Sequence, residues 1–186
     1  AYYAHLLRNQ TTTSMTPQQV HDLGLSEVAR IEAEMAAILA AQNELRAGET
    51  PAQAMSRLAR DPRFLYPNTD AGRQQAIAEY TRMIGEQLER SRGVIGLVPK
   101  APIEVQRVPE FKEKTAPGAY YSLPALDGTR PGVFYANLRD MADVPTFGMR
   151  TLAIHEGVPG HHFQIALAQE QAAGPTFRRV LPFTAY

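Results

Sequence analysis

The sequence contains no cysteine, which excludes disulfide bonds and thiolate metal ligands. Any bound metal would therefore be held by histidine, aspartate, glutamate or water. The chain also has no excess of charge, because 19 Lys and Arg residues balance 19 Asp and Glu residues. With no overall field and no dense basic run, the sequence predicts neither nucleic acid nor an anionic lipid surface as a partner.

Long apolar runs are missing as well. The longest apolar stretches are far shorter than the roughly 20 residues that a membrane-spanning helix needs, and the first residues do not resemble a cleavable signal. The sequence therefore predicts a soluble chain without a membrane span. It leaves both an exported or periplasmic location and a cytoplasmic one open.

What the sequence does contain is an ordinary globular composition. Its 186 residues, 44% apolar and 20% charged, are enough for one domain with a hydrophobic core. The chain opens at AYYAHLLRN without Met and stops at LPFTAY without a polar tail. We therefore expect residues 1–186 to be a single-domain fragment whose partner is the remainder of a longer parent chain.

Residues 1–93 carry helical patterns. Thr16 followed by Pro17 is an N-cap and first-turn signal, and apolar residues then recur at helical spacing. Gly24 is the expected break if this first long helix is divided in two. The predicted helices of this region lie at about 17–46, 50–60 and 69–93.

Residues 94–145 differ in composition, with more Pro and Gly and with the β-favouring runs IEVQRV and GVFYANL. The turn-rich segment LDGTRPG would let YYSLP pair with VFYANL, and an irregular surface loop is the alternative. Helical spacing resumes over residues 146–186 and is interrupted at Pro159-Gly160. The predicted fold class is mainly α-helical, with a small element of two or three β-strands between about 103 and 138.

The run IHEGVPGHHFQ holds three histidines and a glutamate within eight residues. A zinc hydrolase needs imidazole or carboxylate ligands, an open position for water, and a carboxylate that takes the proton of that water. In the H-E-x-x-H motif the two histidines lie one helical turn apart. Here the next histidines follow His155 by six and seven residues, and seven residues of regular helix rise about 10.5 Å. An undistorted helix therefore cannot place both rings on one ion.

Pro159 and Gly160 offer a way to close this gap. Proline removes a helical hydrogen bond and glycine tolerates the backbone angles of a bulge. If two residues are looped out of the helix, His161 lies one helical turn after His155, where the second ligand of the H-E-x-x-H motif would be. For His162 to reach the same position, three residues would have to be looped out. We therefore predict His161 as the second ligand.

Glu156 is then the predicted general base. His162 is either an alternative ligand or a neighbour that orients a ligand or contacts substrate. The competing interpretation is that these histidines only pack or cap, as we expect for His5 and His21. Four such residues in one apolar helical run are costly to bury unless they are paired or bound to a metal.

Several segments, taken in order, resemble the bacterial family called domain of unknown function 885. They are YYAHLLRNQTTTSMTPQQVHDLGLSEVARIEAEM near the start, DPRF at 61–64, VPEF at 108–111, DGTRPGVFYANL at 127–138 and LAIHEGVPGHHFQIALAQE at 152–170. The family in turn resembles the gluzincin metallopeptidases, mostly helical enzymes whose zinc is held by two histidines of the motif helix and a glutamate further along.

This resemblance implies a helical metallopeptidase-like domain with His155 and His161 as zinc ligands and Glu156 as general base. Other motifs with lengthened spacing keep a Gly-His pair at the second ligand, as this chain does. In the family, the segment resembling LPFTAY leads into an E-G-W-A-L-Y stretch that would supply the third ligand. The third zinc ligand is therefore expected beyond Tyr186.

The leading hypothesis for function is a zinc metallopeptidase that cleaves peptide or amide bonds. GVFYANL would be an edge strand beside the cleft that pairs with an extended substrate. Substrate contacts, or packing residues as the alternative, would be Tyr120, Tyr121, Tyr135 and Asn137. Two other functions stay open, a non-catalytic helical module that binds a peptide or protein, and a metal-dependent esterase or amidase. With only two imidazoles, we expect the isolated chain to bind zinc weakly and to show little peptidase activity.

Overall fold

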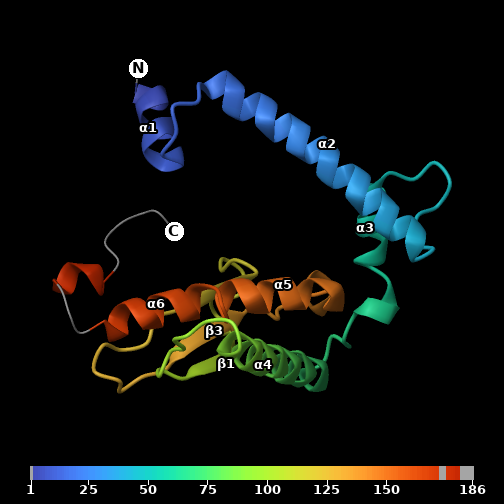
Figure 1. The fold of residues 1–186 in the computed structure, drawn as a ribbon. Coiled ribbons are helices and arrows are strands. Elements are labelled where there is room, and N and C mark those ends of the chain that lie inside the picture. Colours follow the sequence, from blue (N-terminus) through green and yellow to red (C-terminus); the bar gives the residue numbers. More distant parts are fainter. Residues whose placement is uncertain (1, 172–174, 181–186) are drawn as a thin grey trace. The chain divides into compact units, whose positions relative to one another are not determined.

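The computed structural model describes residues 2–171 and 175–180. Contacts within the chain divide it into two compact units, one up to residue 58 and one from residue 59 onward. Most of the secondary structure is helical, and the strands form one small sheet (Figure 1). The mainly α-helical fold with a small β element is thus confirmed. Among the described helices, none combines the length and the hydropathy that crossing a membrane requires.

The first unit consists of three helices. They are α1 (Tyr2–Thr11), α2 (Pro17–Ala41) and α3 (Pro51–Leu58). A capping box begins α2, since the Thr16 hydroxyl accepts from the Gln19 backbone N–H at 3.2 Å and the Gln19 side chain accepts from the Thr16 N–H at 2.8 Å. The cap signal at Thr16-Pro17 is therefore confirmed.

The predicted break at Gly24 is wrong, because α2 runs through it without interruption. A glycine inside a helix costs only about 1 kcal/mol relative to alanine, which the rest of a long helix can offset. The Ser26 hydroxyl does not cap a new helix but donates to the Leu23 carbonyl at 2.8 Å. The helix ends earlier than predicted, shortly before Asn43, whose φ of 57° is left-handed.

The second unit combines helices with the sheet. Its elements are α4 (Asp70–Arg92), β1 (Ile103–Arg107), β2 (Ala119–Ser122), β3 (Gly132–Ala136), α5 (Thr146–Glu156), α6 (His161–Glu170) and short 3-10 turns at 62–64, 141–143 and 176–178. The Thr69 hydroxyl caps α4 by accepting from the Gly72 N–H at 3.2 Å. The helix boundaries near 69 and 93 are therefore confirmed.

The strand order in the sheet is β1-β3-β2, with β1 parallel and β2 antiparallel to β3. The predicted pairing of YYSLP with VFYANL is confirmed, with Tyr120 opposite Tyr135. GVFYANL, however, is not an edge strand, because β3 has a neighbour on each side. It cannot add a substrate strand to the sheet.

The core of this unit joins α4, α5 and the sheet. Tyr80 of α4 meets Phe134 of β3 edge to face, with ring centroids 4.9 Å apart, and both side chains are buried. Arg150 of α5 reaches Glu86 of α4 at 3.3 Å. These contacts fix α5, which carries the first half of the histidine motif, against α4.

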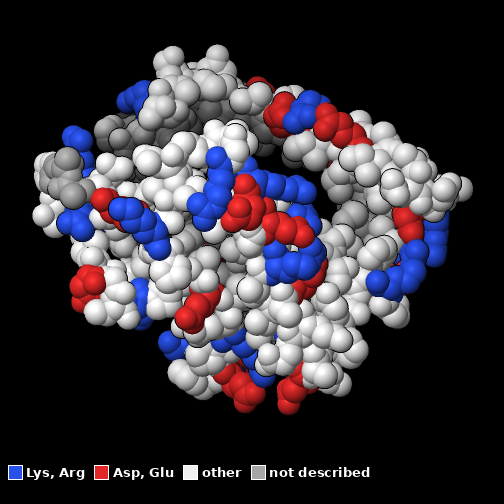
Figure 2. Space-filling view, turned by 60° about the horizontal axis from the view of Figure 1, so that its bottom comes forward, with Lys and Arg blue, Asp and Glu red and all other residues white. Residues whose placement is uncertain are grey.

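Charged side chains of opposite sign lie next to one another on the face shown in Figure 2. Along α4, for example, Arg82 pairs with both Glu79 and Glu86 at helical spacing. Neighbouring charges on this face therefore compensate one another locally.

Candidate metal centre

The histidine motif lies where one helix ends and another begins. In Figure 1, α5 and α6 follow each other end to end, in orange and red. The Gly160 N–H donates to the Ile154 carbonyl at 2.9 Å, and the Val158–Pro159 peptide is cis. The sequence predicted a bulge within one helix, and the structure instead contains a complete break over residues 157–160.

The break brings His155 and His161 together. Their ring centroids are 4.7 Å apart, with the ring planes at 83°. The metal-ligating atoms of His155, Glu156 and His161 all lie within 4.8 Å of one another. Of the two candidates for the second position, His161 is thus the one beside His155, as the argument from looped-out residues predicted.

Glu156, the last residue of α5, is buried, with 6% of its surface exposed. Within residues 2–171 and 175–180, its carboxylate has no hydrogen-bond or ion-pair partner. Its oxygens are not among the fully buried atoms without a partner, so the carboxylate stays accessible to water and to a cation at this point. The cluster therefore offers two imidazoles and one uncompensated acidic group at a single point.

His162 faces a different environment. It is buried, and its Nδ1 lies 2.8 Å from the Tyr121 hydroxyl of β2. Burial lowers the pKa of His162 to about 4, although a backbone hydrogen bond at Ala101 favours the charged form. Burial also raises the pKa of Tyr121. Since the neutral ring carries one N–H and donates it to the Ala101 backbone, Nδ1 is the acceptor and the protonated Tyr121 hydroxyl is the donor.

Gly132 makes this contact possible. A Cβ at Gly132 would overlap the Tyr121 hydroxyl and would lie 2.8 Å from the His162 Nδ1. The Tyr121–His162 pair links β2 to the first turn of α6, directly after His161. Of the two roles predicted for His162, the geometry favours that of a neighbour that positions His161.

Tyr121→Phe should lower the free energy of unfolding by about 1–3 kcal/mol, because it leaves the buried Nδ1 of His162 without its donor. Tyr120→Phe is the matched control, since Tyr120 stacks on Tyr135 with centroids 4.9 Å apart and its hydroxyl has no partner in the described part of the chain. Urea denaturation of both variants checks this. Equal stability of the two would show that the Tyr121–His162 hydrogen bond contributes nothing.

Of the four predicted substrate contacts, Tyr121 reaches a histidine of the motif, and the other three make contacts within the sheet and its loops. Tyr120 and Tyr135 stack on each other across β2 and β3, and Tyr121 pairs with His162. The Asn137 side chain donates to the carbonyls of residues 113, 116 and 117, so it holds the loop before β2. These contacts agree with the packing alternative for Tyr120, Tyr135 and Asn137, and a contact with substrate stays a prediction.

A shallow hollow of about 400 Å³ lies beside the cluster, lined by His155, His161, Gln164 and the residues of the helix break. Gln164 was not among the predicted site residues. Its signal in the sequence is the i+3 spacing from His161, which places both side chains on one face of α6. An amide there can donate to a carbonyl oxygen in the hollow.

The chain belongs to a bacterial family described as protein of unknown function (DUF885), whose model matches residues 1–186. It is also similar to a solved structure described as "the putative lipoprotein from Colwellia psychrerythraea", with a TM-score of 0.92 and 39% sequence identity. That match covers 98% of this chain and 31% of the other, so the chain spans about a third of its relative. A search of curated proteins gives no match.

The family resemblance inferred from the sequence motifs is thus confirmed. The segment LPFTAY, which the resemblance connects with a third ligand, lies outside the described residues.

Proposed function

We propose that this chain provides part of the zinc site of a hydrolase that cleaves peptide or amide bonds. His155 and His161 are the metal ligands and Glu156 is the general base. The observation that carries the proposal is the convergence of their ligand atoms within 4.8 Å across the break between α5 and α6.

The residues fit a zinc ion. Nitrogen ligands lie about 2.0–2.1 Å from zinc, so two ligands of one ion are at most about 4.2 Å apart. The ligand atoms of His155, Glu156 and His161 lie within 4.8 Å of one another, so a small side-chain movement would bring both imidazoles onto one ion. Glu156 as a base acts through water and need not bind the metal. The buried, unpartnered carboxylate supplies the negative charge that a cation site requires. Zinc bound there supplies Lewis-acid polarisation of the scissile carbonyl and acidification of water.

Glu156 then takes the proton of the attacking water and passes it to the leaving amine. Its place on the last turn of α5, next to His155, keeps the base beside the ligands. The Tyr121–His162 pair holds the first turn of α6 and with it His161. The proposal takes the third protein ligand from a glutamate beyond Tyr186, as the family resemblance implies.

The test is zinc binding by the 186-residue chain. Two imidazoles leave most of the coordination to solvent, so we expect one weak site with a Kd no tighter than about 1 μM. His155→Ala and His161→Ala should each remove measurable binding in isothermal titration. His21→Ala is the matched control, since His21 is exposed on α2 and should leave binding unchanged.

Unchanged binding in both His155→Ala and His161→Ala would refute the assignment of the ligands. Nanomolar binding by the unmodified chain would show that a further ligand within residues 1–186 had been overlooked. For the reaction itself, cleavage of a peptide amide by the zinc-loaded parent protein supports the proposal, and cleavage of esters alone contradicts it.

A further inference from the structure

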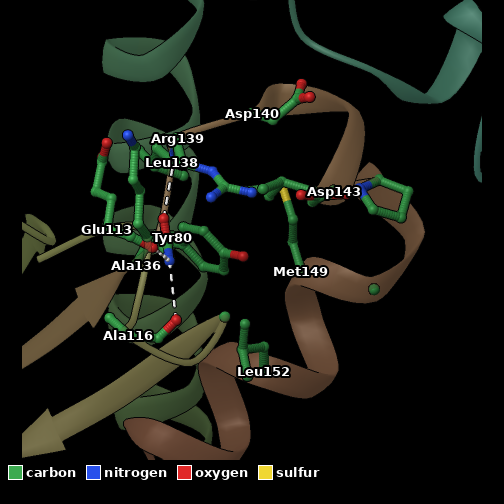
Figure 3. Close-up of a pocket in the computed structure, with 16 residues that line it drawn as sticks. Tyr80, Glu113, Ala116, Ala136, Leu138, Arg139, Asp140, Asp143, Met149 and Leu152 are labelled. Carbon is green, nitrogen blue, oxygen red and sulfur yellow. Dashed lines mark hydrogen bonds between the residues drawn. The ribbon is translucent and has the colours of Figure 1, made fainter. Parts of the chain in front are cut away.

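A second pocket, of about 330 Å³, lies away from the histidine cluster (Figure 3). It is bounded by α4, by the segment that follows β3, and by the first turns of α5. It shares no lining residue with the hollow beside His155 and His161. Its volume is at the lower end of the range for small-molecule sites, which favours a small ligand.

A buried hydroxyl opens into this pocket. Tyr80 is 1% exposed, and Figure 3 shows its hydroxyl pointing from α4 into the space in front of Met149. In the part of the chain that the structure describes, this hydroxyl has no hydrogen-bond partner. The hydroxyl oxygen is not among the fully buried polar atoms that lack a partner, so it is accessible from the pocket and free to donate to a molecule bound there. Burial raises the pKa of Tyr80 to about 12, so the group is a donor at neutral pH.

Positive charge is available above the hydroxyl. The Arg139 side chain reaches over the same space in Figure 3, and Lys114 also lines the pocket. Neither side chain has an ion-pair partner among the described residues. Two uncompensated basic groups thus accompany the Tyr80 donor.

The acidic side chains of the lining are mostly engaged elsewhere. The Glu113 carboxylate accepts from Arg107 at 2.6 and 3.1 Å. Asp140 accepts from the Ala142 N–H at 3.0 Å and points away from Tyr80 (Figure 3). A bond to a neutral N–H leaves the charge of Asp140 in place, so Asp140 and Asp143 balance Lys114 and Arg139 in the lining as a whole. The place for an anion is therefore beside Tyr80 and Arg139, away from the Asp140 carboxylate.

The remaining surface is apolar. Leu138 and Met149 are fully buried at the wall, and Leu152 continues it along α5. A ligand that suits this pocket therefore combines a small acidic group with a short hydrocarbon part.

We propose that this pocket binds a small carboxylate with an apolar body. The carboxylate accepts from the Tyr80 hydroxyl and pairs with Arg139, while the body packs against Leu138, Met149 and Leu152. The site is independent of the zinc proposal, because it uses none of the same residues.

The test is a titration of the 186-residue chain with 4-methylpentanoate, followed by NMR, with 4-methylpentanamide as the uncharged analogue. We expect saturable binding of the acid at one site and at least tenfold weaker binding of the amide. Tyr80→Phe keeps the ring and its packing but removes the donor, and should weaken binding of the acid about tenfold. Arg139→Gln should weaken it by a similar factor and make it less sensitive to salt.

Arg90→Gln is the matched control, since Arg90 is an exposed arginine of α4 that does not line the pocket. This variant should bind the acid with the same affinity as the unmodified chain. Equal binding of acid and amide would overturn the proposal, as would unchanged affinity in Arg139→Gln. So would the lack of saturable binding at about 10 mM acid, a concentration well above the millimolar Kd of a weak specific site. If Tyr80→Phe does not fold, exposed Arg139 still decides the outcome.

Discussion

In the intact parent protein, Glu156→Gln should reduce the turnover number of the zinc-loaded enzyme by about 10²- to 10⁴-fold, the usual contribution of a general base. Glutamine keeps the size and the hydrogen-bonding reach of glutamate but cannot accept a proton from water. The loss should therefore fall on the chemical step, with zinc content and KM close to those of the unmodified protein. The measurement is steady-state peptide hydrolysis combined with metal analysis of the same samples.

His155→Ala separates the role of the base from that of a ligand. Removing a ligand should lower zinc occupancy itself, so activity should fall in proportion to bound metal. Full zinc content together with full activity in Glu156→Gln would rule out Glu156 as the base. That result would favour a base on another residue near the cluster. Gln164 is unsuitable for this role because an amide has no proton-accepting carboxylate.

The helix beginnings could be predicted from the sequence because capping is local. Thr16 and Thr69 each bind a backbone N–H within three residues, so each cap is determined by a few neighbouring side chains. The interruption at Pro159-Gly160 could be placed for the same reason. Whether the interruption is a bulge or a full break could not be predicted, because the Pro159-Gly160 pair is compatible with both.

The position of β3 in the sheet depends on contacts that are distant in sequence. Its antiparallel partner β2 is joined to it by the loop of residues 123–131, whereas the parallel pairing with β1 spans about 30 residues. One signal was present, since GVFYA is almost continuously apolar, and such runs are typical of strands buried on both faces. The second pocket had no such signal, because Tyr80 and Arg139 meet only through the packing of α4 against the segment after β3.

The two histidines meet only if the chain can pass closely over the end of α5, and Gly160 is the residue that permits this. A Cβ at Gly160 would overlap the carbonyl oxygens of Ile154 and His155. Both atoms are backbone, so no side-chain rotation can relieve the overlap. Gly160→Ala should therefore lower the free energy of unfolding by about 3 kcal/mol or more, at the upper end of the cost of overpacking.

The same variant should also lose zinc binding, because the backbone must shift between His155 and His161 to make room for the methyl group. Gly85→Ala is the matched control, since Gly85 is exposed inside α4 and a Cβ there meets nothing within 4 Å. At that position alanine should stabilise the chain by up to about 1 kcal/mol through helix propensity alone. Urea denaturation and zinc titration of both variants should therefore give shifts of opposite sign in stability and a loss of metal binding in Gly160→Ala alone. If Gly160→Ala keeps its stability and its zinc, the close passage at the helix break is not what holds the two imidazoles together.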